Sequence, residues 1–292
     1  MAISQVLTPR QDDVGGQPIL RALPAAQCRS VGPFVFFDYI LPHEYPPGQG
    51  MHIHQHPHIG LSTLTYLFEG ELLHKDSLGS QERVRPGDVS WMTAGRAIAH
   101  VERTPGELVE TGSRLHGLQV WLAMPRDKEQ GDPSYYYFEY DELPSHTANG
   151  VQITLIAGHG FRLVSPVPVL SPTLYASVSM AADSTLLIPD EHTQRAVFLL
   201  SGEAYLGADV LPPQALVVLE EGTETTLSTA TGARLALIGG AALDGPRSMN
   251  WNFVSSDPGL IERARSRWAV GDWPQVPGEA GRVELPGPAR RG

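Results

Sequence analysis

The sequence predicts an all-β protein, and three observations support this fold class. The 292 residues include 30 glycines and 25 prolines, a large number of turn formers without the period of a collagen. The apolar stretches are short, rich in β-branched and aromatic residues, and bounded by glycine or proline. Hydrophobic residues make up 41% of the chain and charged residues 18%, which is ordinary for a folded protein with a sizeable core.

The first third of the chain has the pattern of successive strands. Residues 31–41 form an apolar, aromatic run, and β-branched and aromatic residues dominate 59–74, which favours strand over helix. Tight turns then bracket shorter strands, and 116–124 closes the series. The polar, proline-bounded segment 125–134 is interpreted as a linker.

The second part of the chain repeats this pattern more loosely, with further short β-like runs. Gly70-Glu71 and Gly202-Glu203 each lie between two apolar strands, and superposing them gives an offset of 132 residues. One match of a short motif is weak evidence of duplication by itself. It gains weight because both halves are similarly long and all-β.

One helix is predicted near the end of the chain, over 255–269. Ser256 is the expected N-cap, and Pro258 lies in the first turn. Apolar residues then fall at helical spacing on one face: Leu260, Ile261, Ala264 and Trp268. The proline- and glycine-rich tail that follows is expected to end in mobile residues.

Composition also limits the class of ligand and the compartment. With 21 basic and 32 acidic residues the net charge is −11, so duplex nucleic acid is not the expected direct ligand. A single cysteine, Cys28, excludes an intrachain disulfide framework and fits a reducing compartment. The first residues lack the pattern of a signal peptide, and no apolar run approaches the ~20 residues that span a bilayer. We therefore expect a soluble, cytoplasmic protein that does not bind membranes.

Four histidines occupy alternate positions: His52, His54, His56 and His58. If this stretch is an extended strand, all four side chains point to one face. Neutral imidazoles bind iron, copper, nickel and zinc, so this row of histidines is a candidate metal-binding site. The alternative is a solvated, histidine-rich loop.

A second pair, His100 and Glu102, has the same i, i+2 spacing and would also project to one side of a strand. Two such pairs on neighbouring strands can converge on one ion, with His56 and His58 supplying the other half. The site would then contain three imidazoles and one carboxylate. His100 taken alone is better explained as a core histidine with satisfied hydrogen bonds.

Several segments together resemble the pirin family, a two-barrel branch of the cupin superfamily. They are HPHIG (56–60), TYLFEGE (65–71), HKDSLGS (74–80), RPGDVSWMTAGRAIAH (85–100) and LQVWLAMP (118–125). The resemblance is strong from about residue 31 to 125 and looser beyond. It implies an all-β fold of two tandem cupin (double-stranded β-helix, jelly-roll) barrels with a short C-terminal helix. We expect an N-terminal metal-binding barrel over 1–140, a metal-free barrel over 141–245, and a C-terminal extension over 246–292.

The resemblance also implies one Fe(II) per chain, with another divalent transition metal as the alternative. The positions that match the family's ligands are His56, His58, His100 and Glu102. This chain departs from the family pattern at three nearby positions, with Ser62 for a usual Glu, Ala97 for a usual Gly and Val101 for a usual Ser. None of these changes removes a ligand, but Ser62 removes a carboxylate from the neighbourhood of the metal.

Four further residues near the motifs have two interpretations each. His52 and His54 are more readily explained as exposed histidines than as support for the metal site. His74 matches a family position, yet capping of a turn beside Asp76 explains it equally well. Arg96 could place a cation near an anionic substrate or pair with an acidic neighbour.

The offset of 132 residues tests whether the second half carries a similar site. Positions 56, 58 and 100 map to Ile188, Asp190 and Gly232, and His192 lies two residues out of register. The mapped positions do not provide a set of metal ligands, so this barrel is predicted to be metal-free and structural.

Two functions from different classes follow from the resemblance. The first is a non-haem Fe(II)-dependent dioxygenase of the quercetin 2,3-dioxygenase type, which acts on a small aromatic substrate such as a flavonol. Glu102 would be its catalytic base, because it is the only one of the four residues able to accept a proton while the histidines remain bound. The second is a redox-sensing regulatory protein that acts through protein partners, as a transcription cofactor or a modulator of a metabolic enzyme.

Overall fold

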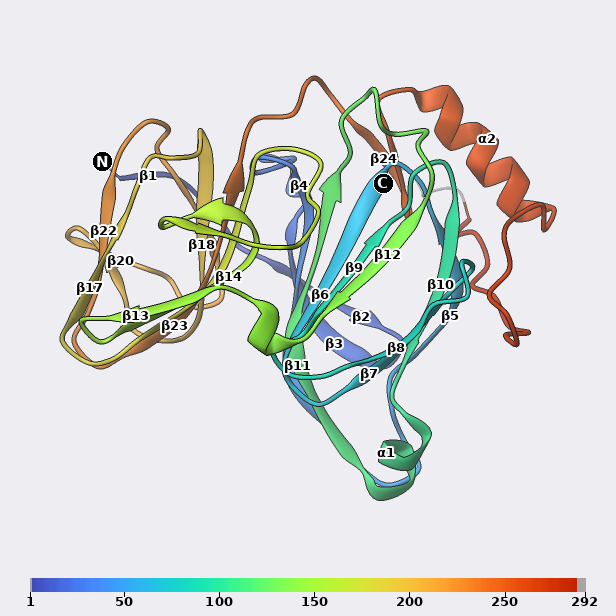
Figure 1. Ribbon diagram of the computed structural model, residues 1–292, viewed down its shortest axis with the longest axis horizontal. Helices are drawn as coiled ribbons and strands as arrows, with labels where there is room; N and C mark the ends of the chain where they lie inside the picture. The colour runs from blue at the N-terminus through green and yellow to red at the C-terminus, as the bar shows by residue number, and fades with distance from the viewer. Residues whose placement is uncertain (1, 288–292) are drawn as a thin grey trace. The chain divides into compact units, whose positions relative to one another are not determined.

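The computed structural model describes residues 2–287, which form two compact units built almost entirely from antiparallel strands (Figure 1). Within the described residues, one unit comprises 13–19, 40–137 and 244–287, and is called the site unit here. The other comprises 2–12, 20–39 and 138–243, and is called the second unit. The all-β prediction is confirmed.

The compact units are discontinuous in sequence, whereas the predicted ranges 1–140, 141–245 and 246–292 are contiguous. Residues 244–287 pack as part of the site unit. At the other end, β1 (Ile3–Leu7) pairs with β21 (Leu216–Leu219) and so belongs to the second unit. The three predicted domain ranges stay a prediction, and their boundaries do not coincide with those of the compact units.

Two large sheets and the small β24-β25 pair build the site unit. One has the order β5-β10-β7-β8, and the other has the order β12-β9-β6-β11-β4-β3-β2. Unit boundaries fall within β2, β3, β4 and β12. The strands are β2 (Arg10–Val14), β3 (Gln17–Leu23), β4 (Phe34–Tyr45), β5 (His52–His58), β6 (Leu61–Glu69), β7 (Leu72–Asp76), β8 (Gln81–Val84), β9 (Val89–Thr93), β10 (Ile98–Arg103), β11 (Ser113–Ala123) and β12 (Ser134–Phe138). A short helix that the sequence did not predict, α1 (Gly106–Thr111), connects β10 to β11.

The second unit also has two sheets, with the orders β1-β21-β18-β23-β16-β14-β13 and β17-β22-β19-β20, and β15 added to β14. Its alternate residues meet in one apolar cluster, which includes Leu155, Val178, Ile188, Leu199 and Leu237. The elements are a short 3₁₀ helix (Tyr140–Glu142), β13 (Ser145–Ala148), β14 (Val151–Gly160), β15 (Leu163–Val164), β16 (Thr173–Met180), β17 (Ser184–Ile188), β18 (Gln194–Gly202), β19 (Tyr205–Leu206), β20 (Asp209–Val210), β22 (Thr225–Thr229) and β23 (Ala233–Gly240). Aliphatic side chains therefore fill this barrel.

The two glycines superposed by the offset of 132 residues play the same structural role in their own units. Gly70 and Gly202 have φ values of +80° and +83°, which side chains other than glycine rarely adopt. A Cβ at Gly70 would lie 1.8 Å from the carbonyl oxygen of Arg114, and one at Gly202 would lie 2.1 Å from that of Gly232. Each glycine thus turns the chain directly against a neighbouring backbone, which explains why the motif recurs.

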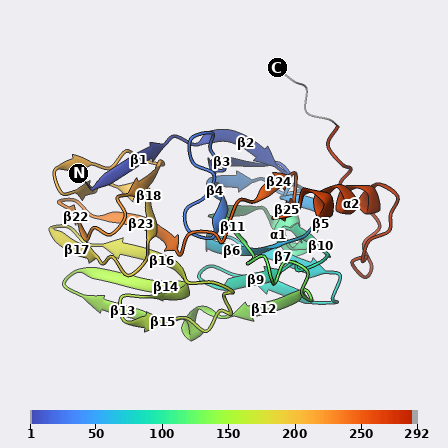
Figure 2. The same ribbon diagram turned by 90° about the horizontal axis from the view of Figure 1, so that it is seen from above.

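The predicted C-terminal helix is confirmed as α2 (Pro258–Ala269), which follows β24 (Ser248–Asn250) and β25 (Phe253–Ser255). Its N-cap is Asp257, whose side chain accepts a hydrogen bond from the backbone N–H of Gly259, and not Ser256 as predicted. Ser256 instead donates to Glu129. The helix lies beside β24 and β25 in Figure 2.

Residues 273–287 belong to the site unit and are held to the rest of it by a few buried side chains. Trp273 and Val276 are buried with Trp268 of α2 and with Ile59, at the end of β5. The residues expected to be mobile at the end of the tail, 288–292, lie outside the described residues. Among the residues described, no helix is both long and apolar enough to cross a membrane.

The prediction that 125–134 is a linker is wrong. Glu129 in this segment is buried and pairs with buried Arg247, with 2.8 Å between Oε1 and Nε. Ser255 and Ser256 donate further hydrogen bonds to the same carboxylate. The segment's polarity indicated solvent exposure, but an acidic side chain can be buried when a cation and several donors surround it.

Candidate metal centre

An irregularity in β5 decides which of its histidines face the interior. β10 pairs with β5 so that His100 lies opposite His56, whereas Glu102 lies opposite Ile53. Two residues of β10 therefore oppose three of β5, which is a β-bulge and reverses the alternation of side chains.

The bulge separates the histidine row into two pairs, so the prediction that all four share one face is wrong. His52 and His54 are exposed, with ring centroids 4.2 Å apart. His56 and His58 are buried, at 6% and 1% exposure. The interpretation of His52 and His54 as exposed histidines is confirmed, although they lie in a strand rather than a loop.

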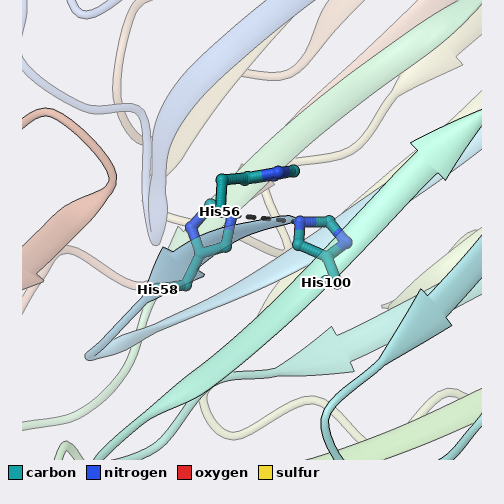
Figure 3. Close-up of side chains that lie close together, drawn as sticks. All are labelled: His56, His58 and His100. Carbon is teal, nitrogen blue, oxygen red and sulfur yellow. Dashed lines mark hydrogen bonds between the residues drawn. The ribbon is translucent and has the colours of Figure 1, made fainter. Parts of the chain in front are cut away.

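His56, His58 and His100 come together in the interior of the site unit (Figure 3). One ring nitrogen from each lies within 4.8 Å of the others, and all three residues are buried. The Nε2 atoms of His58 and His100 are 3.1 Å apart. The ring of Trp121 packs edge-on against His58, with 5.2 Å between centroids.

Burial keeps these rings neutral. It lowers the pKa of His58 and of His100 well below the ordinary 6.5, and neighbouring imidazoles lower both further. Burial also lowers the pKa of His56, against the opposing effect of the Glu102 carboxylate. Neutral imidazoles are the form that binds transition metals, so the donor set fits such an ion.

Glu102 lies near this cluster without being part of it. Gln119 Nε2 donates to both carboxylate oxygens at 3.1 Å each, and Thr65 Oγ1 donates to Oε1 at 3.2 Å. Thr65 and Gln119 are cross-strand partners on β6 and β11, so the carboxylate of β10 reaches across the interior to the opposite sheet. Its role as a fourth metal ligand stays a prediction.

His74 connects the cluster to a buried carboxylate. Its Nδ1 lies 3.5 Å from His100 Nδ1, and its Nε2 lies 3.3 Å from Asp76 Oδ2. The ring stacks on Tyr135, with centroids 4.3 Å apart and an angle of 11° between planes. Burial alone would raise the pKa of Asp76, but hydrogen bonds from His74 and Ser80 outweigh it and lower the pKa.

The remaining sequence candidates lie elsewhere. Arg96 pairs with Asp132, and both side chains are largely exposed, which favours the structural interpretation of this arginine. Ser62 hydrogen-bonds Thr93 at 2.9 Å. In the second unit, His192 donates to the backbone carbonyl of His159, a contact that uses its Nε2.

Sequence reasoning missed Thr65, Gln119, Trp121 and Tyr135, which come from strands without a histidine motif. Strand alternation does not single out Thr65 or Gln119, because residues of both parities are buried on their strands. Pairing them with Glu102 needs the distance between two sheets, which no local pattern provides.

Comparison with known proteins identifies the family. The family model "Pirin" matches residues 16–122, and "Pirin C-terminal cupin domain" matches 175–274. A pirin-like protein of Caulobacter vibrioides is 39% identical over 287 residues, which cover 97% of this chain and 96% of that protein. The chain belongs to the pirin family. The resemblance to pirins and the prediction of two cupin barrels are thereby confirmed.

This pirin is also similar to proteins named for an activity. A Pseudomonas aeruginosa protein provisionally named quercetin 2,3-dioxygenase is 36% identical over 271 residues, covering 92% of this chain and 84% of that protein. A crystal structure of quercetin 2,3-dioxygenase from Acinetobacter baumannii matches with a TM-score of 0.90 and 32% identity, over 98% of this chain and 96% of that one. A bacterial pirin of Escherichia coli, solved in complex with nickel(II), shares the fold at a TM-score of 0.65 and 17% identity, over 82% and 99% of the two chains.

Proposed function

We propose that this pirin is a metal-dependent dioxygenase of the quercetin 2,3-dioxygenase type, with one Fe(II) per chain and a flavonol-type substrate. The observation that carries the proposal is the buried group of three neutral imidazoles beside a hydrogen-bonded carboxylate. The names of similar proteins point to the same reaction class.

His56, His58 and His100 would hold the metal, with Glu102 as the fourth ligand. A bound divalent iron would supply a Lewis acid and redox chemistry with dioxygen. Trp121, packed edge-on against His58, would provide an aromatic wall for a planar substrate.

Glu102 would accept the proton of the substrate hydroxyl. Gln119 and Thr65 hold its carboxylate by three hydrogen bonds, so its oxygens have a fixed position before substrate binds. The histidines cannot accept this proton readily while their lone pairs are committed to a metal.

The test is oxygen consumption by the iron-loaded protein with a panel of flavonols, together with metal content. His56→Ala and His100→Ala should lose most bound iron and most oxygen uptake, while Arg96→Ala, on the surface, should retain both. If both histidine variants stay folded and keep full metal content, the metal assignment is wrong. No uptake by iron-loaded protein across the panel would contradict the dioxygenase proposal and favour a regulator that acts through protein partners.

A further inference from the structure

His100 lies at the end of a buried chain of hydrogen-bonding groups that begins at Asp76. The carboxylate is fully buried, and its Oδ1 accepts from the backbone N–H groups of Leu78 and Ser80, at 2.8 and 3.0 Å. Its Oδ2 faces His74 Nε2 at 3.3 Å. The turn after β7 thus fixes which oxygen is available to the histidine.

The chemistry of these groups sets the direction of each hydrogen bond. An ionised carboxylate only accepts, so His74 Nε2 carries a hydrogen. In a neutral ring, His74 Nδ1 is then the acceptor, and His100 Nδ1, 3.5 Å away, is the donor. His100 is left with its lone pair on Nε2, the nitrogen that lies 3.1 Å from His58 Nε2 within the histidine cluster.

His56 also keeps its lone pair on Nε2, but a different hydrogen-bond partner fixes this tautomer. Its Nδ1 lies 2.9 Å from the backbone carbonyl oxygen of His54, which only accepts. His56 Nδ1 therefore carries the hydrogen, and its Nε2 keeps the lone pair. The bulge that turns His54 outward also supplies this carbonyl.

We propose that Asp76 and His74 are positioning residues that hold His100 in the tautomer with its Nε2 lone pair directed at a transition metal. Tyr135 stacks on His74 and is hydrogen-bonded to Ser90 at 3.0 Å, so it holds the His74 ring in its orientation. This inference rests on the proposed metal site and extends it to residues that do not touch the metal. Partners of ligand histidines commonly fix their tautomer and orientation in this way.

Asp76→Asn tests the direction of the hydrogen bonds between Asp76, His74 and His100, because it changes the shape of the side chain little. The side-chain oxygen of Asn must face the two backbone N–H groups, because its NH₂ group cannot accept from them. The NH₂ group then faces His74 and donates to Nε2. This reverses each bond, so His74 Nδ1 donates to His100 Nδ1 and the hydrogen of His100 moves to Nε2, where it blocks the metal.

The first measurement is the ¹⁵N spectrum of the imidazoles in metal-free protein at pH 8, where an ordinary imidazole is neutral. Wild type should show His100 protonated on Nδ1, and Asp76→Asn should show it protonated on Nε2. The second measurement is metal affinity by competition with a chelator, where Asp76→Asn should weaken binding by ~10–100-fold. Ser62→Ala, which removes a buried hydrogen bond elsewhere in the same unit, should leave both unchanged.

A wild-type His100 protonated on Nε2 overturns the proposal, and this result needs no variant that has to fold. Metal affinity of Asp76→Asn within twofold of wild type overturns it as well. Neither measurement depends on flavonol turnover, so an inactive but metal-binding protein would contradict the dioxygenase proposal alone. Full metal affinity in His100→Ala would instead show that the proposed metal site itself is wrong.

Discussion

His100 and Glu102 project from alternate positions of one strand, yet their side chains meet different chemistry. His100 ends among three other imidazoles, whereas Glu102 ends between a hydroxyl and a primary amide. The two side chains of one strand therefore lie in different surroundings, one among imidazole rings and the other among hydrogen-bond donors. The i, i+2 spacing predicted that the two side chains of each pair share one face of a strand, and the contacts of His56, His58 and His100 with one another and of Glu102 with the opposite sheet agree with this.

Glu102→Gln separates metal binding from turnover. The substitution keeps the size of the side chain and one carbonyl oxygen, but removes the charge and the basicity that proton transfer needs. Oxygen consumption per bound iron should fall by ~10²–10⁴-fold, with a smaller loss of iron. The measurement is flavonol-dependent oxygen uptake, normalised to iron content. Equal rates per iron in both proteins would exclude Glu102 as the base.

At the scale of the element, strand β5 shows where sequence patterns reach their limit. Alternation along an ideal strand puts four histidines on one face, but the bulge places His52 and His54 outside and His56 and His58 inside.

The segment after helix α2 could not be predicted to contain buried residues either, because its prolines and glycines indicate irregular structure without indicating burial. Groups of that segment bond to strands β5, β7 and β10. Gln55 Oε1 accepts from the backbone N–H of Val276, and Lys75 and Arg103 pair with Glu279.

Trp273→Ala should destabilise the site unit by about 3–5 kcal/mol, as large-to-small changes of buried aromatic residues do. Trp273 is 5% exposed, packs against Phe253 and Trp268, and donates a hydrogen bond to the carbonyl oxygen of Ile98 on β10 at 3.0 Å. All five tryptophans belong to the site unit, so urea unfolding followed by tryptophan fluorescence reports on it. Val270→Ala, at a site that is 80% exposed, is the control. A Trp273→Ala midpoint equal to that of the control would show that the tail contributes little.

At the scale of the molecule, the offset of 132 residues aligns His56 of the site unit with an aliphatic residue of the second unit. Ile188, which aligns with His56, lies in the apolar cluster that fills the second unit. The compact units themselves could not be predicted in this way, because strand β1 pairs with β21, more than two hundred residues away. Pairing over such separations leaves no local pattern in the sequence.

The buried imidazoles predict the sign of the pH dependence of stability. Folded His58 has a pKa well below 6.5, mainly through burial, whereas the unfolded chain restores the ordinary value. Below pH 6.5 the unfolded chain therefore binds a proton that the folded chain does not, and the unfolding free energy falls until the folded pKa is reached. Between pH 6.5 and 5.5, metal-free wild type should lose about 1 kcal/mol more than metal-free His58→Gln. Equal losses, measured by urea unfolding, would contradict this assignment, because other titrating groups are common to both proteins.

Because the site unit is built from separate stretches of the sequence, it can be completed only late during synthesis. The three clustered histidines are translated within the first hundred residues, but the unit is completed by 244–287, which are translated after the second unit. Domains that are contiguous in sequence fold from the N-terminal end during synthesis. Here the outer side of β5 and β10 stays uncovered until Trp268, Trp273 and Val276 have been made. Protease resistance of β5 and β10 in ribosome-bound chains should therefore appear only after α2 and the segment beyond it have emerged, so a unit that is begun early is completed only after the second unit has been made.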